Sequence, residues 1–480
     1  MPFEPKQFLP LVPEIVLLTL ACAVMLIDLG IRQRNRVVTY WLAQFTVFAT
    51  AFAIWLVSDL ATAIVLNGTF VLDPMAVGAK YFVCLVTFAV FLYSKDYLSD
   101  RSLFKGEYYV LGLFGLLGMM ILISAASLLT LYLGLELLAL SLYAMVAFDR
   151  DNAVASEAAM KYFVLGAMAS GMLLYGMSIL YGITGSLQLE DIASVSLRDE
   201  EHRLATAFAL SFIVIGIGFK FGAVPFHMWV PDIYQGAPTS VTLYIGSAPK
   251  IAAFVLAMRL LVDGLAATRP DWSQMLAVLA VLSLAIGNVV AIAQTNIKRM
   301  LGYSTISHVG FLLLGLLAGT DSGYASAMFY AVTYAITAAA GFGVIIALSR
   351  KGFEAERLDD YRGLNDRHPW LAFLMMLVMF SMAGVPPMVG FFAKLAVIEA
   401  VIEAGQVWLA VVAVFFSVIG AYYYLRVVKM MYFDAPESEQ AVSVGAGTRL
   451  LLSANALVLL VLGWLPGGLL AWCARWIAAS

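Results

Sequence analysis

Long apolar stretches separated by short polar loops are the dominant pattern of this 480-residue chain. A helix needs about 20 apolar residues to cross a bilayer, and fourteen stretches approach or exceed that length. They cover residues 10–30, 38–58, 74–93, 108–127, 128–148, 158–184, 204–230, 239–262, 274–294, 300–319, 323–349, 370–399, 407–431 and 450–472. The pattern therefore predicts an all-α polytopic membrane protein with about 14 transmembrane helices.

One connector has a different pattern, because β-prone residues flank a turn signal in it. Residues 59–73 read DLATAIVLNGTFVLD, and the Asn67-Gly68 pair at their centre is typical of tight hairpin turns. We therefore expect a small hairpin on the outer side of the membrane.

Composition supports a membrane protein and excludes several kinds of site. Hydrophobic residues make up 62% of the chain and charged residues 12%, against about 25% charged in soluble domains. Cys22, Cys84 and Cys473 are scattered without CxxC spacing, which argues against an iron–sulfur cluster, a zinc site or a disulfide framework. Glycine-rich nucleotide motifs are absent from the sequence. We expect no cofactor on this chain and no nucleic-acid partner.

Basic residues are concentrated in the loops of one side. Lys and Arg in short loops stay on the inner side of a membrane. The loops after the first, third, ninth and eleventh stretches contain Arg32, Arg34, Arg36, Lys95, Arg101, Lys105, Lys298, Arg299, Arg350, Lys351, Arg357, Arg362 and Arg367, whereas the opposite loops contain few, among them Arg198, Arg203 and Arg269. This distribution predicts that both termini lie on the outer side.

Two of the apolar stretches are interrupted by prolines and glycines. The seventh contains Pro225 and Pro231, and the twelfth contains Pro386 and Pro387. Broken helices in corresponding positions of two halves are a sequence signature of transporter sites. The two stretches are five spans apart, and because five is odd, repeats of this length are inverted in the membrane.

Few ionisable residues lie within the apolar stretches. They are Glu136, Lys161, Lys220, Lys250, His308 and Lys394, with Lys80 and Glu157 nearer the ends. Glu136, Lys220 and Lys250 are too deep for their side chains to reach the interface, which favours a functional role. For Lys80 and Glu157 we expect snorkelling or a structural ion pair.

Two of the ionisable residues fit more than one role. Lys161 can pair with Glu157 one turn earlier on the same helix. His308 can be a hydrogen-bonded packing residue or part of a proton relay. The sequence leaves both alternatives open.

Protons are the ion that this set of residues fits best. A Glu–Lys contact at about 4 Å in an effective dielectric of about 20 is worth roughly 4 kcal/mol, and moving one charge across 100 mV takes about 2.3 kcal/mol. Making or breaking one ion pair is therefore large enough to load or expel a proton against a membrane potential. Na⁺ or Ca²⁺ would need several oxygen ligands, and the predicted interior offers one central carboxylate.

Four motifs together resemble those of a known family. They are LYLGLELLALSLYAM, FKFGAVPFHMWVPDIYQGAPT, IKRMLGYSTISHVGF and GVPPMVGFFAK. In this order, over nearly the whole chain, they resemble the antiporter-like membrane subunits of respiratory complex I, the proton-pumping NADH:quinone oxidoreductase. Among these the chain is most similar to subunit N, called subunit 2 in mitochondria. It lacks the long C-terminal extension of the largest member, and it has Lys394 where the middle member usually has glutamate.

The resemblance implies a division of the chain. Helices 4–8 (residues 107–263) and helices 9–13 (residues 271–431) would form two inverted five-helix repeats, with broken helices at spans 7 and 12. Helices 1–3 (residues 1–106) would precede them, and helix 14 (residues 448–473) would follow.

The resemblance also implies roles for the intramembrane charges. Glu136 would modulate the lysine of span seven, Lys220 would be the central proton acceptor, Lys250 the connecting site and Lys394 the site toward the outer exit. Lys161 matches a lysine on the sixth span of the family.

Partners and location follow from the same resemblance. FMN, iron–sulfur clusters and quinone would be bound by partner subunits, and the partners would be the other membrane subunits of complex I, including the other antiporter-like subunits, within the lipid bilayer. A bacterial inner membrane is favoured over the mitochondrial one. The motifs are shared with Mrp-type Na⁺/H⁺ antiporters and membrane-bound hydrogenases, which remain alternatives, and a scaffold without transport is a further one.

Overall fold

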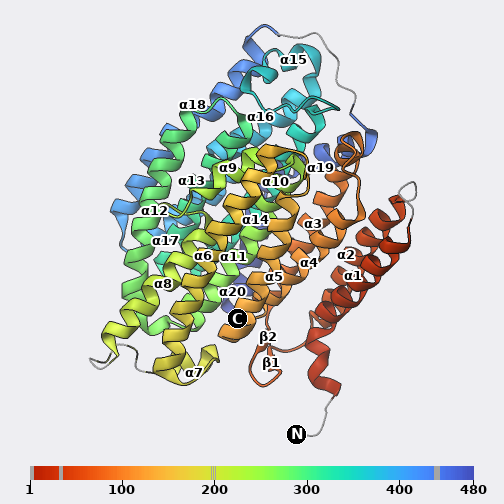
Figure 1. The fold of residues 1–480 in the computed structure, drawn as a ribbon. Helices are drawn as coiled ribbons and strands as arrows, with labels where there is room; N and C mark the ends of the chain where they lie inside the picture. The colour runs from red at the N-terminus through yellow and green to blue at the C-terminus, as the bar shows by residue number, and fades with distance from the viewer. Residues whose placement is uncertain (1–4, 32–35, 196, 198, 200–201, 437–443) are drawn as a thin grey trace.

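The architecture is a bundle of membrane-length helices. A computed structural model describes residues 5–31, 36–195, 197, 199, 202–436 and 444–480. Within these residues thirteen helices are long and apolar enough to cross a membrane, and the shorter apolar helix Pro369–Ala383 accompanies them. The helices α1 and α2 lie at one edge of the bundle, and α12 and α18 lie at the opposite edge (Figure 1). The prediction of an all-α polytopic membrane protein is confirmed.

In the first half of the chain the first six α-helices are long, and most of the helices that follow them are short. Its elements are the 3₁₀ helix Pro5–Leu11, α1 (Val12–Gly30), α2 (Val37–Val57), α3 (Pro74–Asp100), α4 (Gly106–Ile123), α5 (Leu128–Val146), α6 (Ala153–Thr184), α7 (Leu189–Ser194), α8 (Arg203–Phe221), α9 (Trp229–Gly236), α10 (Thr239–Gly246), α11 (Ala248–Ala257), the π-helical turn Met258–Asp263 and the 3₁₀ turn Ala266–Thr268.

The second half of the chain also contains both long and short helices. Its elements are α12 (Arg269–Ile292), α13 (Ile297–Ala318), α14 (Asp321–Leu348), the 3₁₀ turn Leu358–Tyr361, α15 (Leu364–Arg367), α16 (Pro369–Ala383), α17 (Val389–Glu403), α18 (Val407–Phe433), α19 (Ala446–Trp464) and α20 (Pro466–Ala478).

Polar side chains set the starts of several long helices. Ser127 accepts a hydrogen bond from the backbone nitrogen of Thr130 at the start of α5, and Asn296 accepts one from Arg299 at the start of α13. Such caps satisfy backbone N–H groups that have no partner within the helix. The short polar connectors between apolar stretches therefore fix where the spans begin.

Two predicted spans are each divided in the structure. Residues 239–262 form α10 and α11, which are separated at Ser247 (φ −118°, ψ −92°) just before Pro249. Residues 450–472 fall on α19 and α20, and α20 begins at Pro466. Both remain membrane-length apolar stretches, over Thr239–Asp263 and Ala446–Trp464. Proline lacks a backbone N–H and clashes with the preceding turn, which accounts for a division near each proline.

The predicted hairpin is confirmed. Strands β1 (Ala63–Val65) and β2 (Phe70–Leu72) pair in antiparallel register, and Asn67 and Gly68 have positive φ values of 54° and 82°. The backbone nitrogen of Ala126 donates to the carbonyl of Thr69, which fastens the hairpin to the connection between α4 and α5.

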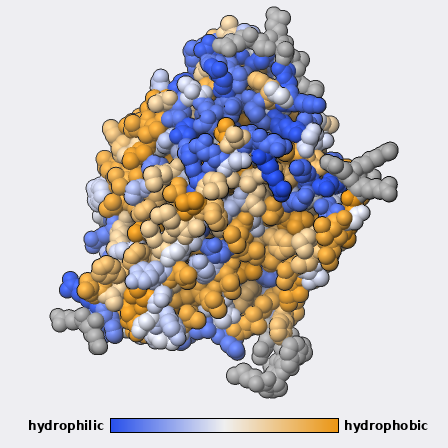
Figure 2. Space-filling view, viewed as in Figure 1, coloured by the Kyte–Doolittle hydropathy of each residue, from blue (hydrophilic) through white to orange (hydrophobic). Residues whose placement is uncertain are grey.

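The bundle has two chemically different ends. One end, named here the hairpin face, contains β1, β2, α7 and the end of α20 (Figure 1). The opposite end, named the basic face, contains α15, the loops with Arg101 and Arg350, and the first turn of α13 with Arg299. Polar residues gather toward this end while apolar residues dominate the flanks (Figure 2). Of the arginines used to predict orientation, Arg32, Arg34 and Arg198 lie outside the described residues.

The helices α4 and α5 are in direct backbone contact at two glycines. A Cβ atom at Gly134 would lie 2.6 Å from the Leu122 nitrogen and 3.0 Å from the Gly118 carbonyl oxygen. A Cβ atom at Gly118 would lie 2.5 Å from the Leu138 nitrogen. Small residues let membrane helices approach this closely. The contact fixes the position of α5, the helix that contains Glu136.

Replacing Gly134 by alanine is expected to push α5 away from α4. Overpacking of this kind typically destabilises by about 1–3 kcal/mol. The midpoint of thermal inactivation and the amount of subunit retained in detergent-solubilised membranes should both fall. Gly171→Ala on α6 is the matched control, because nothing lies within 4 Å of its added Cβ atom; equal behaviour of the two variants would contradict the prediction.

Candidate functional site

Lys220 lies one residue before the end of α8. The helix ends at Phe221, and Gly222 takes the left-handed conformation (φ +78°) that closes it. The backbone of the following segment is satisfied by side chains, since Val224 donates to Ser283 Oγ at 2.9 Å. Trp229, which begins α9, donates from its indole to the Phe219 carbonyl at 2.9 Å. Non-helical backbone is tolerated at membrane depth when protein groups satisfy it in this way.

The ammonium of Lys220 has one direct polar partner in the described part of the chain. It donates to Ser170 Oγ on α6 at 3.1 Å. Glu136 on α5 is close enough for a Coulombic interaction with Lys220 but forms no salt bridge with it within 4 Å. One oxygen of Glu136, Oε1, is buried without a hydrogen-bond partner among the described residues. A buried carboxylate oxygen in this state is costly and is available to an additional donor such as water.

Lys250 joins the eighth span to the end of the helix that contains Lys220. It lies in the first turn of α11 and its side chain is almost fully buried. Its Nζ donates to the Phe221 carbonyl at 2.7 Å and lies 5.4 Å from the centre of the Trp229 ring. The ammonium therefore occupies the negative end of α8, where a cation is electrostatically favoured.

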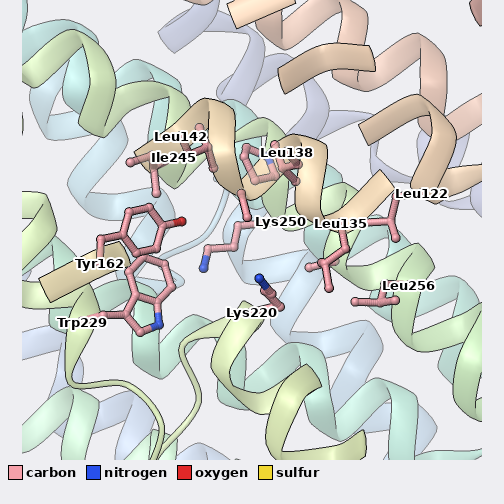
Figure 3. Close-up of a pocket in the computed structure, with 13 residues that line it drawn as sticks. Leu122, Leu135, Leu138, Leu142, Tyr162, Lys220, Trp229, Ile245, Lys250 and Leu256 are labelled. Atoms are coloured by element: carbon pink, nitrogen blue, oxygen red, sulfur yellow. The ribbon is translucent and has the colours of Figure 1, made fainter. Parts of the chain in front are cut away.

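Lys220 and Lys250 line one internal cavity of about 40 Å³. Both amino groups point into it, and Tyr162 and Trp229 close one side (Figure 3). A water molecule needs roughly 10–15 Å³ of such space, so the cavity has room for more than one. The sequence indicated compatible depths for the two lysines, and the structure brings them together.

Lys394 occupies a separate site beside the break between α16 and α17. Its Nζ donates to the Ala383 carbonyl, the last residue of α16, and to Ser417 Oγ of α18, both at 2.9 Å. It also lies 5.2 Å from the centre of the Phe311 ring. Like Lys250, it binds the carboxyl end of an interrupted helix. It does not line the cavity shared by Lys220 and Lys250.

His308 on α13 is buried with partners on both ring nitrogens. Its Nδ1 lies 2.6 Å from the Tyr330 hydroxyl of α14, and its Nε2 lies 3.1 Å from the Tyr424 hydroxyl of α18. Tyr424 lies 2.5 Å from Ser304 Oγ. The sequence predicted neither tyrosine as a site residue, because each belongs to a helix far from His308 along the chain.

Lys161 is half exposed and ion-paired. It contacts Glu157 at 2.8 Å, as the helical spacing predicted, and Asp232 of α9 at 2.9 Å. Asp232 also pairs with Arg299 of α13 at 2.6 Å. Asp232, which the sequence analysis did not select, therefore ties α9 to both α6 and α13.

Two further lysines are more deeply buried than the sequence indicated. Lys80 has no exposed side-chain surface and pairs with Glu14 of α1 at 2.6 Å, which is a structural ion pair and not snorkelling. Lys298, assigned from the sequence to an inner loop, is 3% exposed and donates to the Ala237 carbonyl at 2.7 Å. Its long apolar stem carries the amino group inward from the start of α13.

Within the described ranges, no group of three or more His, Cys, Asp or Glu side chains is arranged to hold a metal ion. The three cysteines are free thiols. The charged groups at the site are therefore mainly lysine amines, one carboxylate and one imidazole. These groups can bind, release and pass protons.

Sequence comparison identifies the family. The profile described as "NADH:quinone oxidoreductase/Mrp antiporter, TM" matches residues 125–420, a range that includes Glu136, Lys220, Lys250 and Lys394. The chain belongs to this family. NADH-quinone oxidoreductase subunit N of Thioalkalivibrio sulfidiphilus is 60% identical over 98% of both chains. The subunit N of Thiobacillus denitrificans is 55% identical over 100% of this chain and 99% of the relative.

Solved structures agree with this family assignment. A chain of respiratory complex I from Thermus thermophilus with bound Aureothin is 31% identical and superposes with a TM-score of 0.83, covering 96% of this chain and 99% of that one. A chain of the Mrp complex from Dietzia sp. has a TM-score of 0.86 at 22% identity, covering 99% of this chain and 97% of that one, which shows a shared fold. The resemblance to antiporter-like subunits of complex I, and to subunit N among them, is confirmed.

Proposed function

We propose that the chain is a proton-translocating membrane subunit of the NADH:quinone oxidoreductase, and that it moves protons outward through Glu136, Lys220, Lys250 and Lys394. The observation that supports this most directly is the cavity shared by Lys220 and Lys250. Two amines around a space that holds water can exchange a proton without crossing apolar packing. Quinone reduction in partner subunits drives the transfer, and the chain thus acts as part of an oxidoreductase without a redox centre of its own.

Electrostatic interactions couple the protonation states of Lys220, Lys250 and Glu136. Two ammonium groups around one low-dielectric space repel each other, so a proton on one favours loss of the proton on the other. The Glu136 carboxylate favours the charged form of Lys220. A change in the distance between Glu136 and Lys220 therefore shifts the proton between Lys220 and Lys250.

The second half of the chain supplies the outward part of the path. Lys394 receives the proton beside the break between α16 and α17, and His308 of α13 acts as a relay within this half. Lys161 assists from the first half, where its pairing with Asp232 positions α9. The two inverted repeats, over residues 107–263 and 271–431, would each contain an interrupted helix with a lysine beside the break.

Partners and location follow from the relatives. The other membrane subunits of complex I, including the other antiporter-like subunits, are the partners within the bilayer. FMN, the iron–sulfur clusters and the quinone site belong to partner subunits. The chain is a multi-pass protein of the bacterial inner membrane, with the basic face inside and the hairpin face, where Ser480 bonds to Met75, on the periplasmic side.

The family description also names Mrp antiporters, which makes a subunit of a Na⁺/H⁺ antiporter the second candidate. Purification through an affinity tag on this chain separates the two. A flavin and an iron–sulfur absorbance should accompany the chain in a complex I, and neither should accompany it in an Mrp assembly.

Replacing Glu136 by alanine tests the proposed path. We expect the variant complex to assemble and to lose both quinone-coupled turnover and pumping, because Lys220 no longer has the carboxylate that favours its charged form. Inverted membrane vesicles with a pH-sensitive dye provide the measurement. Glu190→Ala, which removes an exposed carboxylate of α7, is the control. Full pumping by Glu136→Ala would contradict the proposal, and a scaffold role would then be favoured.

A further inference from the structure

Four buried polar side chains form a continuous hydrogen-bonded row in the second half of the bundle. Ser304 Oγ lies 2.5 Å from the Tyr424 hydroxyl, the Tyr424 hydroxyl lies 3.1 Å from His308 Nε2, and His308 Nδ1 lies 2.6 Å from the Tyr330 hydroxyl. All four residues are at most 8% exposed. The row, named here the hydroxyl row, joins α13, α14 and α18.

The Ser304 end of the hydroxyl row lies toward the basic face. Ser304 is seven residues after the start of α13, which is about 10 Å along the helix. Arg426, two residues after Tyr424, donates to the carbonyls of Ile292 and Gln294, where α12 ends at the basic face. Its Nη2 also lies 3.9 Å from Met300 Sδ, one turn above Ser304. The row therefore begins close to the connection between α12 and α13, at the basic face.

The other end of the hydroxyl row, at His308 and Tyr330, lies near the site of Lys394. His308 and Tyr330 line a second small cavity of about 10 Å³ with Ser381 and Gly390, which flank the break between α16 and α17. Phe311 stacks on Tyr330 with ring centres 5.7 Å apart and lies under the Lys394 ammonium. Ala393, which precedes Lys394 in the chain, also lines this cavity, whereas Lys394 itself does not. The space is at the lower limit for one water molecule, which would extend the path from Tyr330 toward Lys394.

We propose that Ser304, Tyr424, His308 and Tyr330 form a second proton-uptake path, which leads from the basic face to Lys394. The inference rests on the proposed function, because it assigns Lys394 a proton supply besides Lys250. Each hydroxyl accepts one proton and releases another. His308 accepts a proton at Nε2 and releases the one on Nδ1 to Tyr330. The proton passes through the cavity to the neutral amine of Lys394, and rotation of the hydroxyls and a tautomer change of the imidazole reset the row.

A buried tyrosine outside the row, Tyr361, distinguishes this role from packing. It is as deeply buried as Tyr424 and also belongs to the second half of the chain, but its hydroxyl donates to the backbone carbonyl of Ala355 at 2.8 Å. A backbone carbonyl is only an acceptor and has no proton to pass on. Tyr361→Phe is therefore a control for Tyr424→Phe.

The test uses the whole complex in proteoliposomes, with NADH-driven quinone reduction and pumping measured in H₂O and D₂O. Tyr424→Phe and Tyr330→Phe should each slow coupled turnover about tenfold and enlarge the solvent isotope effect, because a proton transfer becomes limiting. Tyr361→Phe should behave as wild type. If either phenylalanine variant fails to assemble, Ser304→Ala is measured in the same way and should give the same two changes.

Two results overturn the inference. One is wild-type turnover in the row variants, and the other is slower turnover without a larger isotope effect, which a loss of packing explains. Lys394→Met separates this inference from the proposed function. Normal pumping by the row variants together with failure of Lys394→Met removes only the uptake path, whereas normal pumping by Lys394→Met contradicts the proposed function itself.

Discussion

Replacing Lys220 by methionine is expected to lower quinone-coupled turnover of the assembled complex by roughly 100-fold, the lower range of what a positioned acid–base group contributes. Methionine fills a similar volume, so the cavity with Lys250 keeps its shape while it loses one of its two amines. The Ser170 hydroxyl loses a hydrogen bond worth about 1 kcal/mol, which is too little to prevent assembly. Turnover is measured as NADH:quinone activity of purified complex with equal subunit content.

A second buried lysine provides the control for Lys220→Met. Lys80 is fully buried and paired with Glu14, away from the cavity. Replacing both partners, by Lys80→Met with Glu14→Leu, removes a buried charge pair, and such exchanges are often neutral for stability. The double variant should keep its turnover. Wild-type turnover in assembled Lys220→Met would contradict the role of Lys220.

Replacing Lys250 by arginine is expected to block turnover to a similar extent although it keeps a positive charge and a hydrogen-bond donor. The guanidinium does not lose its proton in proteins, so it can hold the Phe221 carbonyl but cannot pass a proton on. Lys250→Met removes both functions, and the unpaired carbonyl should add a loss of about 1–3 kcal/mol in stability. Turnover and the thermal inactivation midpoint, measured on the same preparations, separate the two effects.

Comparing Lys250→Arg with Lys250→Met distinguishes a structural role of Lys250 from a role in proton transfer. If Lys250 only stabilises the end of α8, arginine should restore turnover while methionine does not. If it transfers protons, both variants lose turnover and only methionine loses stability. Near-normal turnover of Lys250→Arg would contradict proton transfer at this position.

Apolar length was enough to predict most of the fold, because lipid requires every backbone group of a span to be paired within a helix. It predicted the spans at residues 239–262 and 450–472 but did not indicate that each is divided into two helices. The interruption at Ser247 is one example, where the Ser247 hydroxyl donates to the Leu243 carbonyl at 2.6 Å. A hydropathy pattern does not reveal a break in a helix when the residues around the break are mostly apolar.

The sequence indicated the depth of the candidate site residues but not their contacts. The depth of Lys220 and Lys250 could be read from their position within apolar stretches. Their partners could not, because the Phe221 carbonyl is a backbone group and Ser170 comes from another helix. Lys298 was misassigned for a related reason. Position near the start of a helix indicates a loop charge, whereas the direction of a long side chain depends on what packs beside it.

The tyrosines around His308 mark the limit of single-sequence reasoning at this site. Tyr330 and Tyr424 are 22 and 116 residues from His308 along the chain. Aromatic residues make up 13% of the chain, so no spacing distinguishes these two. Only packing of α13 between α14 and α18 brings their hydroxyls to the imidazole.

The most direct test of the account is the rate of proton translocation by complex that contains Lys220→Met, reconstituted in proteoliposomes and compared with wild type at equal subunit content. If Lys220 transfers protons, we expect the rate of proton translocation to fall at least as much as the rate of NADH oxidation. The variant with Lys80→Met and Glu14→Leu should pump normally. A fully assembled Lys220→Met complex that moves protons at the wild-type rate would contradict this role of Lys220.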